Sequence, residues 1–392
     1  MDYLTFQQLL SPAGQDILQD AIALSPQEPD FLIHYQSLTK RYPANLARAA
    51  LEAAILRREA TSKFPFADRL YLTREALEQA SNHEIAVYRA KRFQPYPRVA
   101  DLGCSVGSDT FALARIAPTL GLDHDRLRLS MASANLDSLG LLANAHLVLS
   151  DLNQPLPFSA GITAMFFDPG RRSNHQRYFS VHQYQPPLAV ISQWLPKHPA
   201  LGVKISPGVN LAEVKEYEAE VEFISLHGEL KEAVLWFGPL NTTQRRATLL
   251  PGPHVLTIEN GAQPSIHKVT DPKTFLYEPD PAVIRAGLVT YLAERLDASQ
   301  VDADIAYLTS EIHTPTPFAR TWAIEAWFPF QLKRLRSFLH QQHVGHISVK
   351  KRGSPLEPDS LIQQLRLKGD QERVVVLTRL RGEPIVMICI RV

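Results

Sequence analysis

The spacing of apolar residues divides the chain into three regions. From residue 1 to about residue 93, apolar residues recur at three- and four-residue steps, most clearly over 44–60 (ANLARAALEAAILRREA), which predicts helices. From 97 to about 250, short apolar runs alternate with helical or looped segments, which predicts parallel strands joined by helices. The remainder is turn-rich with one helix over 279–296. It then follows a helix, strand, helix, strand, strand pattern, which predicts a small α+β module.

Eight apolar runs in the middle region are candidate strands. The first five are expected to be parallel, in a doubly wound Rossmann-like sheet, and the last follow each other closely, as in an antiparallel edge pair. In chain order the runs are RVADLG, LGLD, AHLVLSDL, ITAMFFDP, LGVKIS, VEFISLHG, EAVLWFG and RRATLL. The fold class is therefore α/β, with predicted domains at 1–94, 95–252, 253–319 and 320–392.

Composition limits the class of protein without naming its function. The 392 residues are 45% hydrophobic and 21% charged, as in folded soluble proteins, and the net charge of +1 gives no global field for nucleic acid. Cys104 and Cys389 lie far apart, which favours a reducing, cytoplasmic environment. The start MDYLTFQQLL lacks a basic segment, and no apolar run approaches the roughly 18 residues of a membrane span. We expect neither a secretory signal nor a membrane segment.

The stretch VADLGCSVGSDTFALAR, residues 99–115, has the form of a cofactor loop between a strand and a helix. Gly103 and Gly107 permit a tight turn and a close approach of the backbone to a ligand. The spacing is G-x-S-x-G, with Ser105 in the middle, and differs from the dinucleotide pattern G-x-G-x-x-G. Asp101 stands just before the first glycine, where an acid suits a cationic amino group better than a pyrophosphate.

Three further acids follow strands or open a helix. Asp123 ends the second strand, where a carboxylate can accept hydrogen bonds from both hydroxyls of a ribose. Asp125 stands at a helix N-cap, and Asp151 ends the third strand, near an expected adenine amine. With Asp101, they match the ammonium, ribose diol and adenine amine of S-adenosylmethionine. The alternative is that each acid is a turn or cap residue.

The fourth strand leads into AMFFDPGRR, residues 164–172. This loop resembles the Asp/Asn-Pro-Pro-aromatic motif of amino-methylating enzymes, in which the acid and the next carbonyl orient the target amine. The resemblance implies an orienting or basic role for Asp168, with the carbonyl of Pro169 beside it. Arg171 replaces the aromatic residue, and with Arg172 it is expected to clamp a phosphate or carboxylate, or to form a solvated pair.

Two other polar clusters have weaker patterns. Residues Glu229, Lys231 and Glu232 precede a buried strand and form either the floor of an active site or an exposed charged turn. The fourteen histidines show no ligand spacing, so no metal site is expected.

Nearly the whole chain resembles bacterial class I S-adenosylmethionine-dependent methyltransferases that carry a C-terminal THUMP-like domain. The resemblance rests on KFPFADRLYLTREALEQAS, VADLGCSVGSD, GLDHDRLRLSMASAN, DPGRR, GELKEAVLWFG, YEPDPAVIRAGLV, YLTSEIHTPTPFAR and VKKRGSPLEPDSLIQQLRLKGD. Gly103 stands where the family has cysteine, and Ser105 where it has glycine. The family motifs map onto Asp101, Gly107, Asp109, Asp168, Arg171 and Arg172.

THUMP domains in general bind RNA, so the resemblance implies RNA as a partner. Residues 320–392 hold 13 Lys or Arg against 6 Asp or Glu, an excess of seven in a chain of net charge +1. The alternative is a solvated basic face without a ligand. The candidate RNA-binding residues are Lys333, Arg334, Arg336, Lys350, Lys351 and Arg352.

The leading hypothesis is an S-adenosylmethionine-dependent methyltransferase that modifies an RNA base, in tRNA or rRNA, with the N-terminal helices over the active site. One alternative keeps the enzyme and gives it an anionic small molecule or a protein as substrate. Another is a non-catalytic protein that binds S-adenosylmethionine or RNA. The sequence leaves the oligomeric state open.

Overall fold

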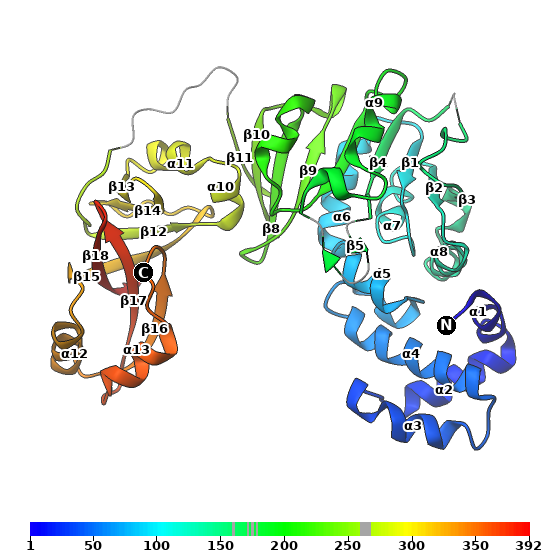
Figure 1. Ribbon diagram of the computed structural model, residues 1–392, viewed down its shortest axis with the longest axis horizontal. Helices are drawn as coiled ribbons and strands as arrows, with labels where there is room; N and C mark the ends of the chain where they lie inside the picture. The colour runs from blue at the N-terminus through cyan, green and yellow to red at the C-terminus, as the bar shows by residue number, and fades with distance from the viewer. Residues whose placement is uncertain (159–160, 171, 174–175, 178, 259–267) are drawn as a thin grey trace. The chain divides into compact units, whose positions relative to one another are not determined.

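The computed structural model describes residues 1–158, 161–170, 172–173, 176–177, 179–258 and 268–392. It divides into two compact units, which we describe separately. The first comprises residues 1–220 and 232–242, and the second residues 221–231 and 243–392. The predicted α/β class is confirmed (Figure 1).

The first unit begins with α-helices, blue in Figure 1, of which the first five share one apolar core. They are α1 (Tyr3–Leu9), α2 (Pro12–Ala23), α3 (Phe31–Leu38), α4 (Ala44–Ala60), α5 (Arg74–Gln79) and α6 (His83–Ala90). The bounds of α4 are those that the apolar spacing predicts, and its Ala47 and Leu51 are fully buried. Side-chain caps begin several helices: Ser11 accepts from the Gly14 N–H at α2, and Asn82 from Glu84 at α6.

Alternating strands and helices complete this unit. They are β1 (Val99–Leu102), α7 (Thr110–Leu113), β2 (Thr119–Asp123), α8 (Arg126–Ser138), β3 (Ala145–Leu149), β4 (Ala164–Phe167), α9 (Ile191–Trp194), β7 (Leu201–Ile205) and β9 (Glu229–Trp236), with a hairpin of β5 (Arg172–Ser173) and β6 (Gln176–Arg177). The strand order is β3-β2-β1-β4-β7-β9. The first five are parallel, as predicted, and β9 is antiparallel to β7. The order reverses between β1 and β4, the place where doubly wound sheets bind ligands.

The second unit contains most of the remaining strands. They are β8 (Glu220–Leu226), β10 (Arg245–Leu250), β11 (His254–Thr257), β12 (Phe275–Pro279), β13 (Ser299–Asp302), β14 (Ile305–Ser310), β15 (Ala319–Pro329), β16 (Val344–Lys351), β17 (Gln371–Leu380) and β18 (Glu383–Arg391). Its helices are α10 (Pro281–Arg285), α11 (Val289–Arg295), α12 (Leu332–Gln341) and α13 (Pro358–Leu365). One sheet has the order β13-β14-β12-β15-β18-β17-β16.

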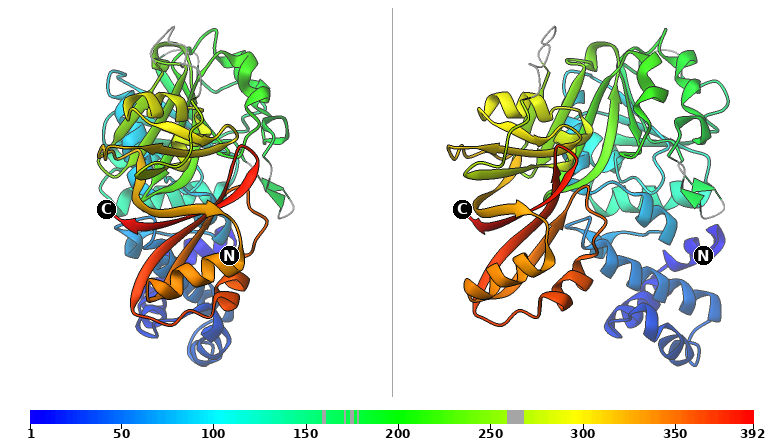
Figure 2. Two further views of the ribbon diagram at one scale, coloured as in Figure 1. Left: turned by 90° about the vertical axis from the view of Figure 1, so that its left-hand side faces the viewer. Right: turned by 60° about the vertical axis from the view of Figure 1, so that its left-hand side comes forward.

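Alternation along β18 shows that this sheet is covered on both faces. Val386 and Ile388 pack with the apolar residues of α12 and α13, whereas Met387 and Cys389 pack with Tyr307 and other residues of the opposite face. Figure 2 shows α12 and α13 lying along the sheet. Burial on both faces explains why PIVMICI is a continuous apolar run.

Several expectations for the second half are wrong. The helix expected over 279–296 is broken between α10 and α11, where Gly287 has a φ of +72°. The turn-rich stretch before it holds strand β12, and after it come β13 and β14. Strand β10 pairs in parallel with β8, and only its other partner, β11, is antiparallel. The predicted helix, strand, helix, strand, strand pattern of the C-terminal module is confirmed.

Candidate active site

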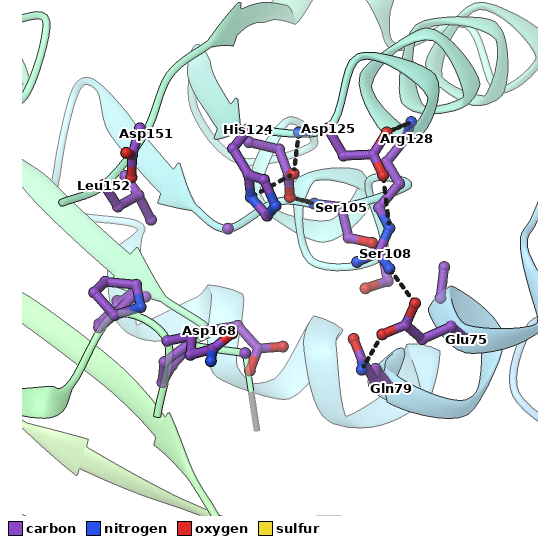
Figure 3. Close-up of a pocket in the computed structure, with 18 of the residues that line it drawn as sticks. Glu75, Gln79, Ser105, Ser108, His124, Asp125, Arg128, Asp151, Leu152 and Asp168 are labelled. Atoms are coloured by element: carbon purple, nitrogen blue, oxygen red, sulfur yellow. Dashed lines mark hydrogen bonds and ion pairs between the residues drawn. The ribbon is translucent and has the colours of Figure 1, made fainter. Parts of the chain in front are cut away.

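A cavity of about 800 Å³ lies in the first unit at the ends of β1, β2 and β4, beside α5 (Figure 3). It is therefore at the switch point of the sheet. Seven residues that the sequence singled out line it: Gly103, Ser105, Asp123, Asp125, Asp151, Asp168 and Pro169.

The loop after β1 brings its backbone close to the loop after β4. A Cβ on Gly103 would lie 2.6 Å from the carbonyl oxygen of Asp168, so only glycine fits there. Ser105 has a φ of +51°, a conformation that favours glycine, and its N–H donates to Asp123 Oδ2 at 2.9 Å. The Ser105 hydroxyl is buried without a hydrogen-bond partner in the described part of the chain. The serine thus carries both a strained backbone and an unused polar atom at the cavity.

Asp123 is nearly buried at the end of β2 and already organises two loops. Its Oδ2 accepts from the Ser105 N–H, and its Oδ1 accepts from the Asp125 N–H at 2.9 Å. His124 Nδ1 also lies 3.5 Å from Oδ1. A carboxylate has about four acceptor positions, so capacity remains for further donors. This capacity fits the predicted contact with two ribose hydroxyls.

Asp125 and Asp151 line the cavity and also have local structural roles. Asp125 caps α8 by accepting from the backbone of Leu127 at 2.8 Å and of Arg128 at 3.1 Å. Asp151 lies two residues beyond the end of β3 and accepts from the Asn153 N–H at 2.9 Å, a bond that lowers the pKa of its carboxyl. Both acids are turn or cap residues that also face the cavity.

Asp101, Gly107 and Asp109 do not line the cavity. The Asp101 carboxyl is fully buried; its Oδ2 accepts from the Thr110 hydroxyl at 2.6 Å, and its Oδ1 has no partner among the described residues. Burial, and next the nearby charge of Asp109, raise the pKa of Asp101 to about 8. Gly107 has a φ of +94° and lies against the Phe111 ring. The structure therefore gives Gly107 and Asp109 positions in the support of the loop.

Asp168 projects from the loop after β4 and is held by a buried lysine. Lys204 on β7 is 2% exposed, and its Nζ lies 2.7 Å from Asp168 Oδ2 and 3.2 Å from the carbonyl oxygen of Gln79. The ammonium balances the carboxylate charge and fixes its orientation at the cavity wall. Beyond Pro169, Gly170 and Gln185 exchange two backbone hydrogen bonds of 2.9 Å, which fixes the start of the loop.

The predicted arginine clamp stays a prediction. Arg171 lies outside the described residues, and of Arg172 only the backbone, in β5, is described.

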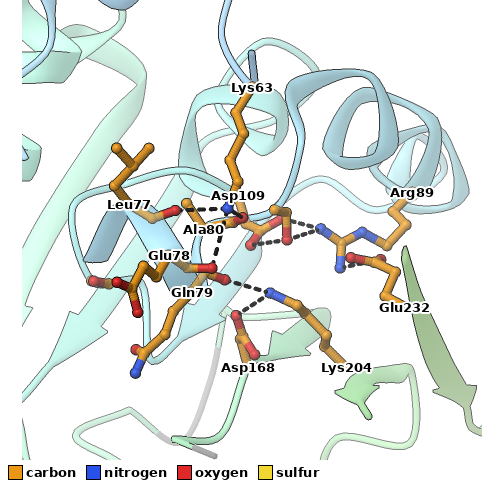
Figure 4. A network of polar contacts seen from close by, with 12 residues as sticks. Lys63, Leu77, Glu78, Gln79, Ala80, Arg89, Asp109, Asp168, Lys204 and Glu232 are labelled. Atoms are coloured by element: carbon orange, nitrogen blue, oxygen red, sulfur yellow. Dashed lines mark hydrogen bonds and ion pairs between the residues drawn. The ribbon is translucent and has the colours of Figure 1, made fainter. Parts of the chain in front are cut away.

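A buried ionic network connects α6, the end of the cofactor loop and β9 (Figure 4). Arg89 on α6, 2% exposed, pairs with Asp109 and, at 2.9 Å, with Glu232 on β9. Burial raises the pKa of the Glu232 carboxyl. Glu229 and Lys231, by contrast, form an exposed pair at 2.5 Å. The residues at 229–232 are thus the first residues of β9: its start is exposed and its Glu232 belongs to the buried network.

The N-terminal helices supply one wall of the cavity through Glu75, Glu78 and Gln79. The Nζ of Lys63 donates to the carbonyl oxygens of Leu77, Glu78 and Ala80 at 2.7, 3.1 and 2.9 Å, which holds the end of α5. Arg128 of α8 pairs with Glu75 at 2.7 Å. The wall is therefore tied to the cofactor side of the sheet.

The sequence-based site omitted Lys204, Arg89 and the residues of α5. A detectable signal existed for Lys204, which interrupts the apolar strand LGVKIS, because a charge on a buried strand needs a partner. Arg89 and α5 gave no such signal, because their contacts come from elements distant in the sequence.

The six basic residues predicted to bind RNA lie in the second unit in two groups. On α12, Lys333 is exposed, Arg334 lies over the Phe328 ring at 4.3 Å, and Arg336 donates to the carbonyl oxygen of Gln364. At the end of β16, Lys350 and Arg352 pair with Glu278 at 2.6 and 3.8 Å, and Lys351 pairs with Glu357 at 2.6 Å. Most of the six predicted RNA-binding residues therefore already contact other residues of the protein.

Within the described ranges, no group of three or more His, Cys, Asp or Glu side chains is arranged to hold a metal ion. No helix of those ranges is long and apolar enough to cross a membrane.

The fold is that of Rossmann-like enzymes, which bind a nucleoside cofactor at the switch point of a parallel sheet. The glycine turn after β1 and the acids beyond β2 and β3 line the cavity at this point. Comparisons with known proteins make this specific. Two uncharacterized S-adenosylmethionine-dependent methyltransferases of Mycobacterium tuberculosis are 33% identical over 341 residues, which cover 84% of this chain and 92% of theirs. The chain belongs to the family of S-adenosylmethionine-dependent methyltransferases.

Other similarities agree with this assignment. Residues 319–391 match a model described as THUMP domain-like, and residues 2–60 match a domain of unknown function, DUF8688. The crystal structure of an inferred methyltransferase from Porphyromonas gingivalis W83 covers 98% of both chains with a TM-score of 0.79 at 22% identity, which supports the fold.

The cofactor of this enzyme is S-adenosylmethionine, and the residues present fit it. The unused acceptor positions of Asp123 suit a ribose diol. Asp125 and Asp151, which line the same cavity, add negative charge that suits a cationic cofactor, whereas Asp101 is buried outside the lining. The predictions of an enzyme and of its cofactor are confirmed.

Proposed function

We propose that this methyltransferase transfers a methyl group to a base nitrogen of RNA, in tRNA or rRNA. The observation that carries the proposal is the presence, in one chain, of a methyltransferase cavity and a THUMP domain-like region with a local excess of basic residues. THUMP-like regions resemble RNA-binding modules, and clustered cations favour a polyphosphate substrate.

In this proposal Gly103, Ser105, Asp123, Asp125 and Asp151, which line the cavity, form the cofactor site, and Asp101 supports the loop through its bond with Thr110. When bound, S-adenosylmethionine supplies a methyl group on a positively charged sulfur. Asp123 binds the ribose hydroxyls, and the acids of the cavity favour the positive charge of the cofactor over an anionic one. Gly107 and Asp109 act through the shape of the loop.

The acceptor side of the site consists of Asp168 and Pro169. The Asp168 carboxylate and the Pro169 carbonyl accept hydrogen bonds from the target amine and direct its lone pair. Methyl transfer depends on such positioning more than on acid–base chemistry. Lys204 is a positioning residue, because it acts by holding Asp168 at 2.7 Å.

The test is transfer of a radiolabelled methyl group from S-adenosylmethionine to total RNA from cells that lack the protein. We expect label in a fraction that ribonuclease removes, and loss of this label with Asp168→Ala. A parallel reaction with a whole extract of the same cells tests the alternatives, because label in its protein or small-molecule fraction, with none in RNA, would support them. Cofactor binding without transfer to any fraction would support a non-catalytic protein.

A further inference from the structure

A second cavity, of about 460 Å³, lies within the second unit and is lined mainly by basic and proline residues. Arg320, Lys350 and Arg352 line it together with His227 and His254. Two of these five belong to the predicted RNA-binding set, and the other three come from β15, the turn after β8 and the start of β11. The fold thus gathers basic residues from four separate segments at one place.

Glu278 on β12 organises the cations. Its carboxylate accepts from Lys350 Nζ at 2.6 Å and lies 3.8 Å from Arg352. Arg320 is its cross-strand partner on β15, although their charged groups form no ion pair. Two cations therefore pair with this carboxylate, and Arg320 lies on the neighbouring strand without pairing with it. The other acid of the lining, Asp280, caps α10 by accepting from the Ala282 N–H at 2.8 Å and also accepts from the Ser225 hydroxyl.

Aromatic rings further fix two of the cations. Lys350 Nζ lies 5.0 Å from the centroid of the Trp322 ring, and the guanidinium of Arg352 lies 5.4 Å from that of Tyr307. Both side chains are about one-quarter exposed, which leaves their outer N–H groups accessible from the cavity. Such a fixed arrangement reduces the entropy lost when an anion binds.

Arg320 is the cation whose charge is least compensated. It is exposed and makes no ion pair with any described residue. Its guanidinium lies against the turn after β8, where a Cβ on Gly228 would come within 2.9 Å of an Arg320 nitrogen. The glycine thus leaves room for the guanidinium, whose planar donors suit an anion with two acceptor oxygens.

We propose that this cavity binds a phosphate group of the RNA substrate, with Arg320 as the principal contact and Lys350 and Arg352 beside it. The inference rests on the proposed function, because it assumes that RNA is the substrate. The basic residues of α12 have partners elsewhere or lie outside this cavity, so they do not form the phosphate site.

The test compares Arg320→Gln with Lys368→Gln in the full-length protein. Lys368 is an exposed lysine of the same region that does not line the cavity, so both variants lose one charge. Fluorescence anisotropy with labelled total tRNA at several salt concentrations gives the affinity and its salt dependence. We expect Arg320→Gln to weaken binding about tenfold and to reduce the slope of log affinity against log salt by about one. Lys368→Gln should change neither strongly, and Arg320→Lys should restore part of the affinity.

The outcomes separate the two proposals. If the wild-type protein binds no RNA at low salt, both the proposed function and the site fail. If it binds RNA and Arg320→Gln binds equally well, with an unchanged melting temperature, the phosphate site is refuted and the RNA proposal stands. Calorimetry with inorganic pyrophosphate and nucleoside monophosphates forms the second arm. Binding of these anions that depends on Arg320, with unchanged RNA affinity, would assign the cavity to a free phosphate compound and refute the RNA contact.

Discussion

The two cavities of this chain differ in charge although the net charge is only +1. The cavity of the first unit is lined by Glu75, Glu78, Asp123, Asp125, Asp151 and Asp168, and the cations near it are paired with acids. The cavity of the second unit is lined by Arg320, Lys350 and Arg352 against the two acids Glu278 and Asp280, and Arg320 is unpaired among the described residues. An acidic pocket favours the positive charge of a sulfonium cofactor, whereas a basic pocket favours phosphate. A near-zero net charge can therefore conceal two sites of opposite electrostatic preference.

The largest effect should come from removing the acceptor at the wall of the acidic cavity. Asp168→Ala is expected to lower kcat about 100- to 1000-fold, as loss of a positioned transition-state contact does, with cofactor affinity within about threefold of wild type. Single-turnover transfer assays and calorimetry with S-adenosylmethionine measure the two quantities. Asp137→Ala, an exposed acid on α8, is the matched control. Unchanged turnover in Asp168→Ala would remove this residue from the mechanism.

The next largest effect concerns the cofactor side of the same cavity. Asp123→Asn removes a charge and some of the acceptor capacity that we propose for the ribose, so S-adenosylmethionine affinity should fall about 10- to 100-fold by calorimetry. A thermal melt without ligand checks whether the bonds to Ser105 and Asp125 survive. Affinity equal to wild type in a folded variant would contradict the ribose contact.

Salt should distinguish the two cavities without any mutation. Raising monovalent salt from about 50 to about 200 mM should weaken RNA binding about 20- to 40-fold if the protein contacts three phosphates, because counterion release scales with their number. S-adenosylmethionine binding should change less than about threefold. Equal salt dependence of both ligands would break the proposed division between an acidic and a basic site.

Asp101, which is buried outside the lining of both cavities, should make the stability of the protein depend on pH. Burial and the charge of Asp109 raise the pKa of Asp101 to about 8, so the folded state holds this proton between about pH 4 and 8 while the unfolded state releases it. The contribution of Asp101 to the free energy of unfolding is fully present below about pH 4 and is lost as the pH rises through about 8. Asp101→Asn, which keeps the neutral form, should therefore gain melting temperature relative to wild type between about pH 5 and 8.5, by at least about 3 °C. Glu278→Gln is the comparison, and it should instead lose stability because its cations become unpaired.

The smallest effect is expected at Ser105. Its φ of +51° and its hydroxyl, which has no partner among the described residues, both cost free energy, so Ser105→Gly should raise the free energy of unfolding by about 1 kcal/mol. Chemical denaturation measures this. Ser108→Gly, at another serine that lines the cavity, is the control and should destabilise the protein or leave its stability unchanged. A destabilised Ser105→Gly would show that the hydroxyl has a partner in solution.

Local patterns were sufficient for much of the fold. The alanine-rich periodicity of 44–60 defines α4 to the residue, and the apolar runs after residue 97 define the parallel strands, because burial acts on each segment separately. Local patterns did not predict structure that depends on contacts between residues far apart in the sequence. Strand β15 and the direction of β10 depend on which strand lies alongside, a choice that no single segment records. The domain bounds 95–252 and 320–392 stay predictions.

For the site, local sequence was enough to locate the glycine turn, the acids that follow the strands and the Asp-Pro loop, because each needs a specific residue type at a specific place. Folding then selected which of them face the cavity. It placed Asp123 and Asp168 at the cavity and Asp109 in a pair with Arg89, and it brought Lys204 to Asp168 across 36 residues. It also collected Arg320 and Lys350 around Glu278. Charge pairing in a folded chain depends on distance in space, and no spacing along the chain encodes that distance.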